Sequence, residues 1–253
     1  MTDKKMQVKQ KHRADYKGVL LFYMLLMAAG LSFTRWHLHV SYSSPDFLAS
    51  MTPWIAALAL LSVTVQLKRK SRWNVFWKQQ SHYGTYFIVA LPIGLLAIYS
   101  IYKCSAELSL ITVIAPLLIG VAEEGMYRGI LLRSLLCRIS INQAIFISAL
   151  WFSLLHLLNL LGGQSVSAVG IQLLLTFLNG LYFGAIYVQI KKLPLLVLQH
   201  GLWDFITFSV AIAQSPWMAV VMAFISVIQL ILSIKLMMSY RNRTTEEMLG
   251  IYR

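Results

Sequence analysis

Long apolar segments, separated by short polar ones, recur along the whole 253-residue chain. Most are close to the length of about 20 residues that an α-helix needs to cross the hydrocarbon core of a bilayer. The pattern predicts an all-α, polytopic membrane bundle of about eight transmembrane helices over residues 19–240, with no room for a second folded domain. The predicted spans are 19–33, 51–67, 83–102, 108–127, 147–162, 168–190, 194–213 and 216–238.

Composition and charge support a membrane protein. Hydrophobic residues make up 58% of the chain and charged residues 12%, which excludes a soluble domain with an ordinary surface. If the N-terminus is cytoplasmic, 20 of the 22 Lys and Arg residues lie on the cytoplasmic side, and only Arg35 and Lys103 lie outside. This bias predicts that both termini are cytoplasmic, with basic tails at 1–18 and 241–253. The net charge of +13 thus reflects topology, and no nucleic-acid partner is expected.

Further expectations concern two regions outside the spans and the two cysteines. Polar residues interrupt an apolar helical pattern over 133–146, which predicts an amphipathic helix lying at the cytoplasmic interface. The Thr-Thr-Glu-Glu sequence at 244–247 predicts a short helix in the C-terminal tail. Cys104 falls at an outer helix end and Cys137 at the inner surface, so the two cysteines are not expected to pair.

Two pairs of glycines stand four residues apart, one in the sixth predicted span and one beside Glu123 and Glu124. Gly125 and Gly129 form one pair, and Gly180 and Gly184 form the other. This spacing is common in membrane helices and predicts close approach of neighbouring backbones.

Three charged residues lie in or directly after the apolar span 108–127. Glu123, Glu124 and Arg128 stand out because the chain has only nine Asp and Glu residues, and an ionised side chain at membrane depth costs several kcal/mol on insertion scales. Glu124 and Arg128 are four residues apart and share a helical face, so each can neutralise the other. Glu123 is turned away from this pair. The three residues are either a structural ion pair with a second acid or part of a functional site.

Two histidines also lie inside predicted spans. Phe152 precedes His156 by one helical turn and can orient its ring, although a lone histidine on an apolar helix is often a packing residue. Asp204 follows His200 by one turn, so the two can hydrogen-bond, which would fix the tautomer of the imidazole. Without a catalytic role, the pair of His200 and Asp204 would only stabilise its own helix.

Taken together, these groups come from three separate spans and supply the parts for amide hydrolysis. A carboxylate can hold a water molecule, one histidine can share its proton, and a second histidine can stabilise the developing oxyanion. At 1.5 Å per residue, Glu123 and His200 are each expected about 8–10 Å from the cytoplasmic edge. His156 reaches the same depth if its span begins near residue 147.

The three segments resemble the three motifs of the CAAX proteases and bacteriocin-processing enzymes, the intramembrane glutamate proteases also called the Abi family. The motifs are Glu-Glu-x-x-x-Arg at 123–128, Phe-x-x-x-His at 152–156 and His-x-x-x-Asp at 200–204. The resemblance covers a core of roughly 108–212 and implies an eight-helix endopeptidase in a bacterial cell membrane.

The resemblance also implies a role for each matching residue. Glu123 would be the general base that activates water, assisted by His156, while Glu124 and Arg128 would shape the site, as would Phe152. His200 and residue 204 would stabilise the oxyanion. The prenyl-protein-processing members have Asn at the last position, whereas this chain has Asp204, which cannot donate a hydrogen bond if it is ionised. Asp204 would therefore have to be protonated or act through His200.

Metal dependence has been described for the family, so zinc is an alternative. Glu123, His156 and His200 could supply three ligands and leave a coordination position open. The chain has no H-E-x-x-H helix, and the two histidines are 44 residues apart. We therefore favour a metal-free mechanism without a cofactor.

The expected partners are the lipid bilayer and a peptide or lipidated-protein substrate, cut near the cytoplasmic face. The physiological role would be bacteriocin or signal-peptide maturation, or self-immunity. Two other classes of function remain. A non-enzymatic immunity protein or membrane scaffold could keep the fold without the chemistry, and a proton-coupled transporter could also bury such residues, although the chain has no evident internal repeat. The sequence does not indicate the oligomeric state.

Overall fold

The computed structural model describes residues 16–73, 82–103, 108–209 and 215–241. The predicted tails lie almost wholly outside these residues, as does the short helix expected at 244–247. The described part of the chain consists of helices joined by loops and contains no strand, which confirms the all-α prediction. The helices are α2 (Tyr16–Trp36), α3 (Phe47–Trp73), α4 (Gly84–Lys103), α5 (Leu110–Glu124), α6 (Arg133–Leu136), α7 (Ile141–Leu155), α8 (Val166–Ile190), α9 (Leu193–Phe208) and α11 (Pro216–Tyr240).

Two of the spans are made of several helical segments. A π-helical segment, Gly125–Leu132, joins α5 to α6 without a break, so that one helix runs over Leu110–Leu136. A 3₁₀ turn, His156–Leu160, extends α7. Seven helices in the described residues are long and apolar enough to cross a membrane. The eighth, α9, has 16 residues and is shorter than a typical span.

Serine residues define where several of these helices begin. The Ser109 side chain accepts a hydrogen bond from the backbone N–H of Thr112 at the start of α5, and Ser140 does the same for Gln143 at the start of α7. Ser165 caps α8 in the same way. Each cap satisfies a backbone donor that a helix start otherwise leaves unpaired.

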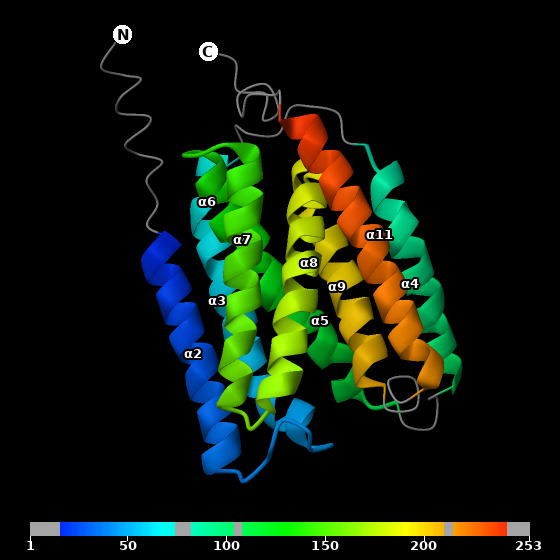
Figure 1. The fold of residues 1–253 in the computed structure, drawn as a ribbon. Coiled ribbons are helices and arrows are strands. Elements are labelled where there is room, and N and C mark those ends of the chain that lie inside the picture. The colour runs from blue at the N-terminus through cyan, green and yellow to red at the C-terminus, as the bar shows by residue number, and fades with distance from the viewer. Residues whose placement is uncertain (1–15, 74–81, 104–107, 210–214, 242–253) are drawn as a thin grey trace.

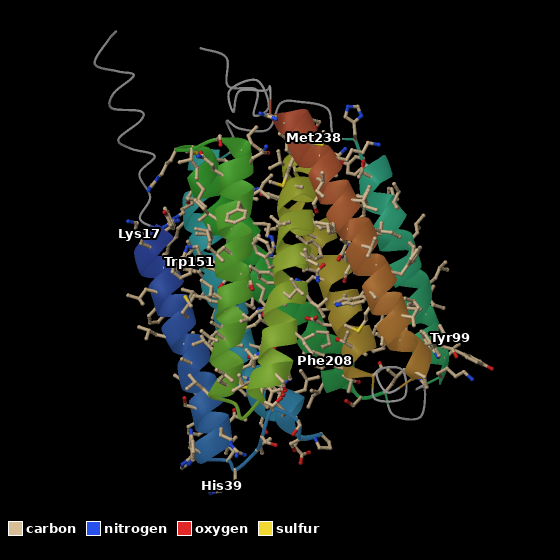
Figure 2. All side chains as sticks on the ribbon, in the orientation of Figure 1. Lys17, His39, Tyr99, Trp151, Phe208 and Met238 are labelled. Carbon is tan, nitrogen blue, oxygen red and sulfur yellow. The ribbon has the colours of Figure 1, made fainter. Side chains whose placement is uncertain are left out.

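The helices stand side by side, with α2 at one edge of the bundle and α4 at the other (Figure 1). The segment Gly125–Leu132 is fully buried and packs against α3, α7, α8 and α9. The outward faces carry apolar side chains, as Figure 2 shows along the length of the bundle. Leu25 on α2, Leu95 on α4 and Phe224 on α11 are each more than half exposed, as expected of side chains that face lipid.

The predicted interfacial helix over 133–146 is wrong. The chain instead ends one helix at Leu136 and begins α7 at Ile141, and most of the apolar residues between and beside these positions are buried in the bundle. The Arg133 guanidinium hydrogen-bonds to the hydroxyl of Tyr187 and lies over its ring. Because this polar group finds a partner inside the protein, it does not force the segment out to the membrane surface.

Glycines set the closest helix contacts, as the glycine spacing predicts. A Cβ atom on Gly180 would lie 2.8 Å from the Cα of Ala149, where α8 crosses α7. A second crossing was not predicted. A Cβ atom on Gly120 of α5 would lie 2.6 Å from the carbonyl oxygen of Val197 on α9, and one on Gly201 would also meet α5 backbone. This close crossing brings the acids of α5 next to the histidine of α9.

Candidate active site

The buried ion pair of the first motif forms as predicted. Arg128 Nη1 lies 2.8 Å from Glu124 Oε1, and both side chains are fully buried. Arg128 Nη2 also donates a hydrogen bond to the carbonyl oxygen of Gly180, at 3.2 Å. The guanidinium lies 4.5 Å from the ring centre of Phe152, which places the second motif directly against the first.

The shortest hydrogen bond of His200 joins it to α5 and not to a residue of its own helix. Its Nδ1 lies 2.7 Å from Glu124 Oε1, the same oxygen that accepts from Arg128. Its Nε2 lies 3.5 Å from Asp204 Oδ2 and 3.6 Å from Glu123 Oε2, both longer than a normal hydrogen bond. The predicted pairing with Asp204 is therefore present as a long ion-pair contact, whereas the sequence pattern missed the link to Glu124.

His156 has a defined orientation. Its Nδ1 lies 3.0 Å from the carbonyl oxygen of Phe152. A carbonyl oxygen only accepts, so Nδ1 carries the hydrogen, and Nε2 of the neutral ring is left as an acceptor. The Phe152 ring packs edge-on against the imidazole, with ring centres 5.2 Å apart, as predicted. Within the described residues, His156 makes no hydrogen bond to Glu123.

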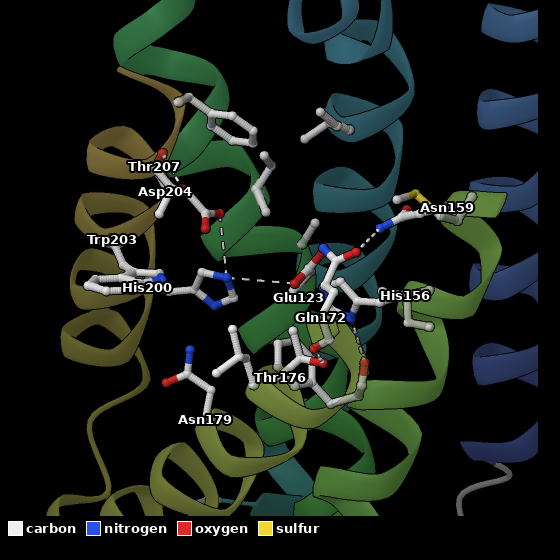
Figure 3. A pocket seen from close by; sticks show the side chains of 18 of the residues that line it. Glu123, His156, Asn159, Gln172, Thr176, Asn179, His200, Trp203, Asp204 and Thr207 are labelled. Carbon is white, nitrogen blue, oxygen red and sulfur yellow. Dashed lines mark hydrogen bonds and ion pairs between the residues drawn. The ribbon is translucent and has the colours of Figure 1, made fainter. Parts of the chain in front are cut away.

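A cavity of about 350 Å³ brings the three motifs together. Glu123, His156, His200 and Asp204 all line it, and Figure 3 shows Glu123 and His200 directed toward each other from different helices. Glu124 and Arg128 do not line the cavity, because they are packed behind it. The structure therefore separates the two adjacent acids, with one facing the open space and the other fully buried.

Further polar side chains line the same cavity, and the sequence analysis did not single them out. They include Asn159, Gln172, Thr176, Asn179 and Thr207, which Figure 3 labels. Asn159 Nδ2 donates to Gln172 Oε1 at 2.9 Å, which ties the end of α7 to α8. A signal was present in the sequence, since the three polar residues of α8 recur at helical spacing in an otherwise apolar span.

Glu123 and His156 lie far from the ends of the helical spans that carry them. The helix that carries Glu123 continues for thirteen residues to Leu136, or about 20 Å, whereas the predicted span ended at residue 127. His156 lies fifteen residues from the start of α7 at Ile141, or about 22 Å. His200, which lies 3.6 Å from Glu123, is only seven residues, or about 10 Å, from the start of α9 at Leu193. The helix of Glu123 does not end where the apolar run is interrupted, and the depth of 8–10 Å below the membrane edge stays a prediction.

The predicted zinc alternative requires Glu123, His156 and His200 to converge on one point. In the described part of the chain, no group of three His, Cys, Asp or Glu side chains is placed so that it could hold a metal ion. The Nε2 of His200 faces two carboxylates, but His156 is not part of that group. The side-chain arrangement therefore does not fit a three-ligand site.

Comparison with known proteins finds one family model that matches part of the chain. No curated protein and no solved structure matches the chain. Residues 105–206 match the model of the family described as Rce1-like, type II CAAX prenyl endopeptidase Rce1-like, and this segment contains all three motifs. The match confirms the resemblance that the three motifs indicate, and it identifies this polytopic membrane protein as similar, over residues 105–206, to the CAAX-protease type of intramembrane endopeptidase.

Proposed function

We propose that this protein hydrolyses a peptide bond of a membrane-associated peptide or protein, with Glu123 as the base that activates water. The observation that carries the proposal is the single cavity lined by Glu123, His156, His200 and Asp204 from three helices. Intramembrane ionisable residues that converge on a cavity are usually functional. The match to an endopeptidase family supports the same reaction class.

Water activation requires a carboxylate with free lone pairs beside the substrate carbonyl. Glu123 faces the cavity and accepts no hydrogen bond from another side chain in the described residues. It can hold a water molecule, take its proton as the oxygen attacks the carbonyl carbon, and later return that proton to the leaving nitrogen. The Nε2 acceptor of His156 can hold the same water by a second hydrogen bond, which orients the attack.

The oxyanion needs a donor that is held in place before the reaction. The Glu124 carboxylate, itself fixed by Arg128, binds Nδ1 of His200 and so orients its ring. In the protonated imidazole, Nε2 also carries a hydrogen, which can be donated to the oxyanion. Asp204 Oδ2 lies 3.5 Å from this nitrogen, so its carboxylate acts through His200 by favouring the protonated ring.

The substrate class follows from the position and walls of the cavity. Most of the lining is apolar, with aromatic and aliphatic side chains from α2, α3 and α8. A peptide with apolar side chains, already bound to the bilayer, suits these walls better than a soluble polar one. We further propose a bacterial role in bacteriocin or signal-peptide maturation, or in self-immunity, with cleavage on the cytoplasmic side and without a metal ion.

The test is cleavage of a library of membrane-anchored peptides by the purified protein in detergent or nanodiscs. Glu123→Gln keeps the shape of the side chain but cannot take a proton, so cleavage should fall by at least about 100-fold. Asp46→Asn, the same change at an exposed acid outside the cavity, is the matched control and should cleave normally. A strong chelator in parallel should have no effect.

Other outcomes would change the assignment. Normal cleavage by Glu123→Gln would contradict the role of this residue. Loss of cleavage in chelator would replace the metal-free mechanism with a metal-dependent one. If neither the wild type nor any variant cleaves any peptide, the immunity or scaffold function becomes the better proposal.

A further inference from the structure

Two polar side chains of α8, Thr176 and Asn179, line the cavity but have no part in the chemistry proposed above. They lie on the same helix, three residues apart, and Figure 3 shows both beside the space under His200. Polar side chains in a membrane helix are costly and usually face a partner or a cavity. The hydrogen bonds that these two side chains make and lack indicate the chemistry of a ligand that they can bind.

Thr176 presents a hydrogen-bond acceptor. Its hydroxyl donates to the backbone carbonyl of Gln172, four residues earlier, at 2.7 Å. The one hydroxyl hydrogen is therefore used within the helix, while the oxygen keeps lone pairs that can accept. An N–H group of a bound ligand could donate to this oxygen.

Asn179 presents a carboxamide with spare capacity. Its Oδ1 atom is buried and has no hydrogen-bond partner in the part of the chain that the structure describes. The backbone around it is held, because the next residue, Gly180, accepts a hydrogen bond from Arg128 and packs against Ala149. A buried carboxamide oxygen without a partner is destabilising, so the position favours a ligand that donates a hydrogen bond to it. The amide nitrogen of the same side chain is a donor and can bind an acceptor of that ligand.

A peptide main chain has this chemistry. Thr176 and Asn179 are separated by about 4.5 Å along the axis of α8, and an extended peptide advances about 3.4 Å per residue. Neighbouring N–H and C=O groups of an extended segment can therefore reach both side chains. Inside a membrane, those groups need such partners because no water is available to them.

We propose that Thr176 and Asn179 bind the main chain of an extended substrate segment and so hold the scissile peptide beside Glu123. This inference rests on the proposed function for the identity of the ligand. Both residues are positioning residues, and recognition through the main chain makes this part of the site tolerant of substrate sequence.

Binding is measured on the Glu123→Gln protein, so that cleavage does not interfere. The probe is a fluorescent, end-blocked peptide of six alternating leucine and alanine residues, added to protein in nanodiscs, with empty nanodiscs to subtract binding to lipid. Thr176→Val and Asn179→Leu keep the side-chain size but remove the hydrogen-bonding groups. Each should weaken probe binding by about 3- to 10-fold, the range for one lost hydrogen bond.

Two substitutions of the same kind serve as controls. Thr52 on α3 donates to the carbonyl of Leu48 at 2.7 Å, the same bond that Thr176 makes, but it does not line the cavity. Asn142 on α7 also has a buried Oδ1 without a partner in the described residues, and it too is outside the cavity. Thr52→Val and Asn142→Leu should leave probe binding unchanged.

Ester analogues of the probe test main-chain recognition directly, since each ester removes one N–H group. An ester at one position should weaken binding by about 3- to 10-fold to the protein that retains Thr176, and should have no such effect on binding to Thr176→Val. This result would pair the N–H group lost at that position with the threonine oxygen. Asn179→Ala is a second variant in case Asn179→Leu does not fold, as judged by gel filtration and thermal unfolding.

The outcomes separate this inference from the proposed function. Equal probe binding by the two α8 variants and the two controls would overturn it and leave Asn179 hydrated by water only. Absence of probe binding to the Glu123→Gln protein would overturn it as well. Probe binding that depends on Thr176 and Asn179, with no cleavage by the wild type, would support peptide recognition while contradicting the proposed endopeptidase activity.

Discussion

Glu124 connects the two halves of the site through a single oxygen atom. Its Oε1 accepts from Arg128 at 2.8 Å and from Nδ1 of His200 at 2.7 Å. The adjacent Glu123 has no such bonds and faces the cavity. Two neighbouring residues of one type thus differ in environment, and this difference predicts different consequences of substitution.

Glu124→Ala should destabilise the folded protein by about 3–5 kcal/mol, because it leaves the buried Arg128 guanidinium without its charge partner. Thermal unfolding of the purified protein in detergent, followed by circular dichroism, measures the loss. Glu123→Ala is the matched control and should unfold near the wild-type temperature. The double variant Glu124→Leu with Arg128→Met should recover much of the loss, and equal destabilisation by the two single variants would contradict the prediction.

At the scale of elements, the site depends on two close helix crossings. Gly120 and Gly201 let α5 meet α9, and Gly180 lets α8 meet α7 while its carbonyl accepts from Arg128. The π-helical segment Gly125–Leu132 follows the acids directly and is wholly buried. π-helical turns occur frequently at functional sites, and this one lies between α3 and the second motif.

Gly180→Ala should destabilise the protein by about 1–3 kcal/mol, because its new Cβ would lie 2.8 Å from the Cα of Ala149, which cannot move away without shifting α7. Gly170→Ala on the same helix is the control. Nothing lies within 4 Å of a Cβ atom at that position, so the substitution should be neutral or slightly stabilising through helix propensity. Thermal unfolding of both variants is the measurement, and similar midpoints would show that the crossing is not tight.

At the scale of the whole molecule, the described chain has seven helices of spanning length and the shorter α9. Figure 1 shows them side by side in one bundle. The orientation in the membrane is predicted from the distribution of Lys and Arg: with a cytoplasmic N-terminus, 20 of the 22 are expected toward the cytoplasmic side. The two natural cysteines, on opposite sides in this topology, make the orientation testable.

A membrane-impermeant maleimide added to intact cells should label Cys104 and leave Cys137 unlabelled, with at least about a tenfold difference in labelling. Cys137 is exposed in the structure, so permeabilised cells should label it readily. Cys104→Ser and Cys137→Ser assign each signal to one residue. Labelling of Cys137 from outside the intact cell would reverse the predicted topology.

Sequence by itself determined the features that depend on local spacing. Apolar segments of bilayer length predicted the helices, and the i,i+4 spacing of Glu124 and Arg128 predicted their ion pair, because both follow from the geometry of a single helix. The three motifs indicated the family that residues 105–206 match. The catalytic role of each residue stays a proposal.

Only the tertiary structure decided which helix faces meet. The bond between Glu124 and His200 joins residues 76 apart, and it depends on the glycine crossing of α5 and α9, which no periodicity reveals. The same holds for Asn179, whose cavity position depends on how α8 is rotated against its neighbours. The segment 133–146 was mispredicted for a related reason. Arg133 hydrogen-bonds to Tyr187 on α8, and local polarity cannot show that a distant residue will pair with a partly buried charge.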